Sequence, residues 1–192
     1  MNNIHILTGS TRSGRFNIQP ARWLARLGES RRNARYNLVD IAEFNLPLLD
    51  EPKSATSQEY QNDHTKKFSE VISQADGFVF VTPEYNHSYS AALKNAVDYL
   101  YVEWSYKPVA FLSYGSMAGG SRAVEHLRVV VGELKMFDIR EQVLLPNYWS
   151  GLDGEGNFQF TPQHEKAASV MFDSLVFWAG KMKQARLELP RE

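Results

Sequence analysis

The chain has 192 residues, a net charge of −1 and no cysteine. Its length suits a single domain over residues 1–192. The near-neutral charge disfavours a nucleic-acid partner, no apolar run approaches the ~18 residues that cross a membrane, and the lack of cysteine excludes thiol chemistry and cysteine-based zinc sites. No metal site is predicted, and any redox chemistry must come from a bound cofactor.

Strand and helix patterns alternate along the chain. In chain order, the sequence predicts a strand at 3–8, a helix at 17–30, a strand at 35–41, a helix at 57–75, a strand at 77–82, a helix at 90–102, a strand at 108–113, a helix at 123–134, a strand at 139–145 and a last helix at 162–187. Five strands, each followed by a helix, favour a parallel sheet with right-handed crossovers. Because residues 1–7 read as the first strand and not as a signal peptide, a cytoplasmic location is expected.

The first predicted strand ends in a loop, residues 8–17, that combines glycine, hydroxyl and arginine residues. Gly9 and Gly14 allow the backbone to turn with its N–H groups exposed. Hydroxyl donors and positive charges surround them, from Ser10, Thr11, Arg12, Ser13 and Arg15. Asn17 suits the N-cap of the next helix, whose N-terminal end favours an anion. The loop therefore predicts a phosphate site; the alternative is an ordinary turn with surface arginines.

Two more loops follow predicted strands. Residues 83–89 form a polar, aromatic loop after an apolar run at 77–81, and residues 113–122 form a glycine-rich loop before a helix. In open parallel sheets ligands bind at the carboxyl edge of the strands, so the three loops are predicted to meet around one ligand. The alternatives are a turn with locally packed tyrosines and a flexible linker. A fourth segment, 150–157, is interpreted as a solvated connector.

The first loop, with Gly9-Ser10-Thr11-Arg12 and Asn17, resembles that of the NADPH-dependent FMN reductase family. Two other segments match the same family, Pro83-Glu84-Tyr85-Asn86 and Leu93-Lys94-Asn95-Ala96, and the similarity covers about residues 3–145. The resemblance implies an α/β flavodoxin-like fold, a three-layer sandwich with a five-stranded parallel sheet in the order 2-1-3-4-5 and helices on both faces. It also implies a homodimer or homotetramer, to whose interface some of the aromatic residues outside the central strands could belong.

The resemblance further implies an oxidoreductase, a flavoprotein with FMN as its cofactor and NADPH or NADH as its co-substrate. Hydride would pass from the nicotinamide to N5 of FMN, and two electrons would then pass to a quinone, an azo compound, chromate or free flavin, so no protein side chain is expected to be catalytic. The alternative is a flavodoxin-like electron carrier or a flavin-based redox sensor with little turnover. The physiological acceptor and the choice between NADPH and NADH stay open.

By the same resemblance, the first loop would hold the phosphate, and backbone groups of Glu84 to His87 would meet the pyrimidine edge of the flavin, with Tyr85 beside the ring. The predicted cofactor-binding residues are Gly9, Ser10, Thr11, Arg12, Arg15, Phe16, Asn17, Pro83, Glu84, Tyr85, Asn86, His87, Ser113, Tyr114, Gly115 and Ser116. Because many family members have serine at the position of Arg15, this residue is assigned either to the FMN phosphate or to a phosphate of the nicotinamide cofactor.

Overall fold

The computed structural model describes residues 1–189, and its centre is a parallel sheet of five strands in the order β2-β1-β3-β4-β5. The strands are β1 (Asn2–Thr8), β2 (Ala34–Asp40), β3 (Gly77–Pro83), β4 (Pro108–Gly115) and β5 (Phe137–Pro146). The helices between and after them are α1 (Ile18–Arg31), α2 (Asp63–Ser73), α3 (Ala91–Asp98), α4 (Ser121–Glu133) and α5 (Pro162–Glu188). The predicted strand order and the α/β flavodoxin-like fold class are confirmed.

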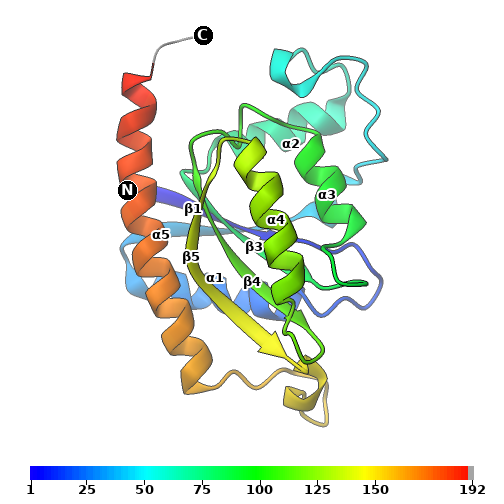
Figure 1. Cartoon of the computed structure of the whole chain (residues 1–192), viewed down its shortest axis with the longest axis vertical. Helices are drawn as coiled ribbons and strands as arrows, with labels where there is room; N and C mark the ends of the chain where they lie inside the picture. Colours follow the sequence, from blue (N-terminus) through cyan, green and yellow to red (C-terminus); the bar gives the residue numbers. More distant parts are fainter. Residues whose placement is uncertain (190–192) are drawn as a thin grey trace.

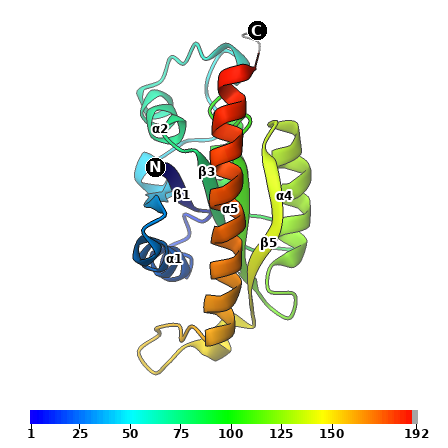
Figure 2. The ribbon, with the colours of Figure 1, turned by 90° about the vertical axis from the view of Figure 1, so that its left-hand side faces the viewer.

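Helices cover both faces of the sheet, with α5 on one side and α3 and α4 on the other (Figure 1). α1 and α5 pack against one set of strand side chains, which includes Ile6 and Val79, whereas α2, α3 and α4 pack against the other set, which includes Phe78 and Phe80. Figure 2 shows α5 lying along its face of the sheet. Because successive strand residues point to opposite faces, β3 is apolar at nearly every position and completely buried.

α2 begins at Asp63, so the predicted helix start at residue 57 is wrong. The backbone N–H groups of Gln61 and Asn62 donate to the two oxygens of Glu51, at 2.8 and 3.0 Å. Gln58 has a positive φ of 54°, which also interrupts a helical path. A carboxylate thus satisfies N–H donors that a longer helix would use, and the chain stays irregular until residue 63.

α3 ends at Asp98, earlier than the predicted residue 102. The Trp104 side chain is fully buried, and its Nε1 donates to the carbonyl of Val97 at 3.1 Å. In a continued helix this carbonyl would accept from the N–H of residue 101. The indole therefore ends the helix, and burial of so large an apolar side chain makes that arrangement favourable. No helix within residues 1–189 is long and apolar enough to cross a membrane.

Candidate functional site

The three loops predicted to meet do so, because β1, β3 and β4 are neighbours in the sheet and end at the same edge. A cavity of about 510 Å³ lies between the loops. Nine of the predicted cofactor-binding residues line it: Arg12, Arg15, Phe16, Pro83, Glu84, Tyr85, Tyr114, Gly115 and Ser116. Ser13 and Gly14 line it as well. The carboxyl edge of the sheet thus has a pocket with two arginines and several rings.

The first loop is held tightly against the end of β3. The N–H of Gly9 donates to the carbonyl of Val81 at 2.8 Å, and a Cβ on Gly9 would lie 2.8 Å from that same oxygen. Only glycine fits there. Ser90 caps α3 by accepting from Leu93 N at 3.0 Å, and its hydroxyl also donates to the carbonyl of Gly9. β3 and α3 therefore hold the loop in one position.

The two arginines of the first loop differ in their pairing. Arg15 forms an ion pair with Asp40 at the end of β2, and the Thr8 hydroxyl donates to the same carboxylate at 2.8 Å. The Nε of Arg15 is nevertheless buried without a partner. Arg12 is exposed, and no residue in the described range 1–189 pairs with its guanidinium. The cavity therefore has one cation that the protein neutralises and one that it does not.

Asn17 stands at the N-cap of α1, as predicted, but its side chain makes no capping hydrogen bond. Its Nδ2 lies 3.5 Å from the carbonyl of Ser10, and its Oδ1 is buried without a partner. Asn17 thus links the two ends of the first loop, and Ser10 and Asn17 lie beneath the cavity lining, almost fully buried.

The second loop is a tight turn between Tyr85 and Ser88, whose backbones exchange hydrogen bonds of 2.8 and 3.0 Å. Asn86 and His87 form its tip, with positive φ angles of 48° and 68°. Both are exposed and lie outside the cavity lining. The Tyr85 hydroxyl lies 3.3 Å from that of Ser10, so this ring turns toward the first loop. Cofactor contacts of Asn86 and His87 stay a prediction.

The third loop turns sharply after β4. The Ser113 hydroxyl is buried and donates to the carbonyl of Gly119 at 2.9 Å, and a Cβ on Gly120 would lie 2.6 Å from the Ser113 Cβ. Ser113 therefore supports the turn from below, while Tyr114 lines the cavity. Burial raises the pKa of the Tyr114 hydroxyl above its ordinary value of 10.0, and the nearby Tyr85 raises it further. This phenol stays protonated and can donate a hydrogen bond at neutral pH.

Part of the connector between β5 and α5 forms a wall of the cavity, so residues 150–157 are more than the solvated connector that we expected, although residues 153–157 are exposed. Trp149, Leu152 and Gly156 line the pocket. The side chain of Gln19 holds the connector in place, donating to the carbonyl of Gly156 at 2.9 Å and accepting from Phe158 N at 2.8 Å. These hydrogen bonds join residues that are far apart in the chain, so no local sequence pattern predicts them.

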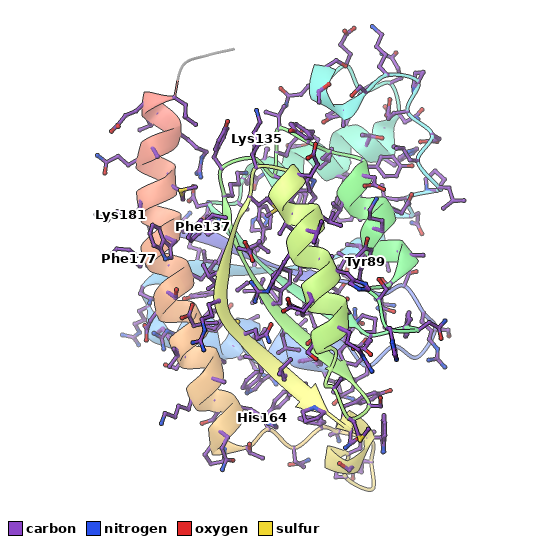
Figure 3. All side chains as sticks on the ribbon, viewed as in Figure 1. Tyr89, Lys135, Phe137, His164, Phe177 and Lys181 are labelled. Atoms are coloured by element: carbon purple, nitrogen blue, oxygen red, sulfur yellow. The ribbon has the colours of Figure 1, made fainter. Side chains whose placement is uncertain are left out.

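Aromatic packing fixes both ends of the connector. Tyr148 stacks on Phe16 with 4.4 Å between ring centroids. At the other end, His164, labelled in Figure 3, lies at the start of α5. It closes the capping box of this helix, because its Nδ1 accepts from Thr161 N at 3.1 Å. The ring of His164 lies 5.8 Å from that of Phe158. The sequence signal that could have found this wall is the row of aromatic residues directly after the last strand.

Other hollows lie outside this pocket, and two of them bear on the predictions. Thr11 turns away from it and lines a cavity of about 320 Å³ beside Leu46 and Leu48. A larger hollow, of about 820 Å³, lies between α4, β5 and α5, and its charged walls include the ion pair of Arg128 with Asp138, at 2.6 Å. Because it lies away from the three loops, we do not assign the larger hollow to a cofactor.

Known proteins resemble this chain in sequence and in fold. The family model of NADPH-dependent FMN reductase matches residues 2–150. An NAD(P)H-dependent FMN reductase of Schizosaccharomyces pombe is 43% identical over 135 residues, which cover 69% of this chain and 67% of that protein. A 2-hydroxy-1,4-benzoquinone reductase of a Burkholderia species is 32% identical over 186 residues, covering 91% and 94% of the two chains.

A solved structure shares the fold. The flavoenzyme NAD(P)H:acceptor oxidoreductase FerB of Paracoccus denitrificans superposes with a TM-score of 0.75 at 19% identity, over 95% of this chain and 99% of that one. At 19% identity this similarity shows only that the two proteins share a fold. The sequence matches speak for more: the chain belongs to the NADPH-dependent FMN reductase family, which confirms both the predicted family and the predicted enzyme class.

Proposed function

We propose that the cavity at the carboxyl edge binds FMN, and that the protein oxidises NADPH or NADH and passes the electrons to a quinone, an azo compound or a related acceptor. The observation that supports this best is the makeup of the cavity itself. Its lining combines two cationic side chains with several aromatic rings, which suits a ligand with a phosphate and a flat ring system.

Unpaired buried polar atoms at the cavity also fit a polar ligand. The Nε of Arg15 is a donor and the Oε2 of Glu84 is an acceptor, and neither has a partner. Buried polar groups are nearly always hydrogen-bonded, so such atoms beside a cavity indicate ligand contacts. The phosphate of FMN has oxygen acceptors that suit Arg15 Nε. The flavin ring and the ribityl chain of FMN have N–H and O–H donors that suit Glu84 Oε2.

We assign the phosphate to the first loop. Arg12 has no anionic partner among residues 1–189 and would bind it directly, whereas Arg15 already shares its charge with Asp40 and would donate through Nε. Bound FMN would supply the hydride chemistry, and the side chains of this protein would bind and orient the reactants. Tyr114 would donate a hydrogen bond, and the closed connector wall would exclude water from one side.

Quinones are proposed as acceptors because they are flat and because the Burkholderia relative is named for one. Trp149 is 53% exposed at the cavity, so a flat molecule can reach its ring. We also propose a cytoplasmic location and a homodimer or homotetramer; sedimentation of a monomer at working concentration would contradict the latter.

The decisive experiment is a visible spectrum of the purified protein with and without added FMN, followed by anaerobic addition of NADPH or NADH. We expect bound flavin bands that bleach on addition of the nicotinamide. Steady-state oxidation with a quinone then separates an enzyme from a simple electron carrier. If FMN does not bind, the proposed cofactor is wrong; if it binds and is reduced without turnover, the proposed acceptors are wrong.

A further inference from the structure

We propose that the side-chain carboxylate of Glu84 contacts the flavin ring directly: its free oxygen accepts a hydrogen bond from the imide N–H of the pyrimidine ring, and Arg122 holds the carboxylate in the required position. This inference rests on the proposed FMN site. It goes beyond that site because the family resemblance implies only backbone contacts from residue 84, and Arg122 was not among the predicted site residues.

The two oxygens of Glu84 have different surroundings. Oε1 accepts from Arg122 Nε at 2.6 Å and also from its Nη2. Oε2 is buried and has no hydrogen-bond partner, although the whole side chain is only 6% exposed. Leaving a buried carboxylate oxygen unpaired is energetically costly, so a donor is expected to meet it. Because Glu84 lines the cavity, a ligand there can provide that donor.

Three elements hold this carboxylate in place. The backbone N–H of Glu84 donates to the carbonyl of Tyr114 at 3.0 Å, which ties the end of β3 to the end of β4. A Cβ on Gly115 would lie 3.4 Å from the Glu84 Cβ, so β4 packs closely against the side chain. Arg122 lies in the first turn of α4. A carboxylate with so little freedom can recognise a donor at a fixed place.

The identity of the donor follows from the chemistry of FMN. Its phosphate has only acceptors and negative charge, so a carboxylate would repel it, and the first loop already offers two arginines for it. The oxidised ring system has one N–H, the imide between the two pyrimidine carbonyls. The loop after β3 adjoins the phosphate-binding loop, because β1 and β3 are neighbours in the sheet, and both loops line the same cavity. A ring that extends from a phosphate at the first loop can therefore reach Glu84. The ribityl hydroxyls are the competing donors, and the test separates them.

The pair of charges also predicts an effect on the reduction of the flavin. A carboxylate beside the pyrimidine ring disfavours the negative charge that the reduced ring gains, whereas Arg122 offsets the carboxylate. Replacing Glu84 with glutamine should therefore make the midpoint potential of bound FMN more positive. Replacing Arg122 with glutamine should make it more negative. A merely structural pair would not shift the potential in opposite directions.

The test compares FMN with 3-methyl-FMN, which lacks the imide hydrogen, by fluorescence titration of wild type and Glu84→Leu. We expect wild type to bind the methylated cofactor about tenfold or more weakly, and the variant to lose most of that preference, because the acceptor is gone. Glu125→Leu, at an exposed position on α4, is the matched control and should keep the wild-type ratio.

Each outcome decides the matter. If Glu84→Leu keeps the wild-type ratio, the carboxylate does not receive the imide hydrogen and the inference is overturned, while the proposed FMN site stands. If wild type binds no FMN, both fall together. If Glu84→Leu does not fold, the potentials decide: opposite shifts in Glu84→Gln and Arg122→Gln support the inference, and shifts of the same sign or no shifts overturn it.

Discussion

Buried polar groups at the carboxyl edge and at the amino edge of the sheet differ in their hydrogen-bond partners. At the carboxyl edge, three buried atoms have no partner in the part of the chain that the structure describes: Arg15 Nε, Asn17 Oδ1 and Glu84 Oε2. At the amino edge, the buried Asp76 accepts from the backbone N–H of Asn3 at 3.0 Å, and Lys183 and Arg186 pair with its carboxylate at 2.9 and 3.1 Å. Asp76 is satisfied by internal pairs, although His5 Nδ1 at the same edge has no partner among residues 1–189, whereas the unpaired atoms of Arg15 and Glu84 belong to residues that line the cavity between the loops.

The strongest titration shifts at the amino edge come from burial. Lys107 donates to the carbonyls of Ile72 and Ser73 at the end of α2, at 3.3 and 3.0 Å, and burial lowers its pKa to about 8. Burial and, second to it, the charge of Lys107 lower the pKa of His5 to about 4. Shifted pKa values often mark active sites, but Lys107 and His5 lie at the edge opposite the cavity, whereas at the cavity itself burial raises the pKa of Tyr114. The comparison predicts that substitutions at the amino edge change stability, and substitutions at the carboxyl edge change binding.

The largest expected effect is acid destabilisation through His5. Its pKa falls from 6.5 to about 4 on folding. Between pH 6.5 and pH 4 the unfolded chain therefore binds a proton at His5 that the folded chain does not bind. The stabilisation is complete above pH 6.5 and is lost as the pH falls toward 4, by about 3 kcal/mol in total. Urea unfolding across this range should show the loss, with a flatter profile for His5→Gln and unchanged FMN affinity at pH 7. An equally steep profile in the variant would contradict this account.

Asp76→Asn should lower the free energy of unfolding by about 2.5 kcal/mol, because two cations and a backbone N–H lose a charged acceptor. Asp173→Asn is the matched control: this residue also pairs with an arginine, Arg31, but its side chain is 65% exposed, so a loss below about 1 kcal/mol is expected. Both values come from urea titration at pH 7. FMN affinity should not change in either variant. A higher Kd for FMN in Asp76→Asn would contradict the expectation that the amino edge affects stability and not binding.

Arg12→Ala should show the reverse pattern, with weaker FMN binding and unchanged stability. Loss of one charged hydrogen bond to the phosphate corresponds to about 2 kcal/mol, or roughly thirtyfold in Kd. Arg22→Ala, at an exposed position on α1, should leave the Kd unchanged. Riboflavin, which lacks the phosphate, should bind wild type and Arg12→Ala equally well. Equal FMN affinity in both proteins would remove Arg12 from the phosphate site.

The smallest effect is expected for Trp149→Ala, measured as the KM for a flat quinone. Loss of a ring contact of about 1 kcal/mol predicts a rise of about fivefold, whereas the KM for ferricyanide, which does not stack, should not change. Phe177→Ala is the control, because Phe177 is 56% exposed on α5 (Figure 3) and does not line the cavity. A rise for both acceptors would show that Trp149 acts on the cofactor instead.

Much of this protein could be predicted from short stretches of its sequence. The apolar run of β3, the glycine pattern after β1 and the loop at 83–89 each lie within about ten residues, and each predicts its own local structure. Together with the alternation of strands and helices they predicted the fold, the family and the edge of the sheet at which the loops surround a cavity. Physically, these features depend on backbone geometry and on burial, which neighbouring residues determine.

Tertiary structure decided the rest. Glu51 delays α2 and Trp104 ends α3, and neither contact is visible in the periodicity of those helices. Gln19 reaches Gly156 across 137 residues to build the connector wall, and Arg122 reaches Glu84 across 38. Such contacts form between side chains that only the completed sheet brings together, so the sequence alone determined which loops surround the cavity, and the packed fold decided which side chains complete it.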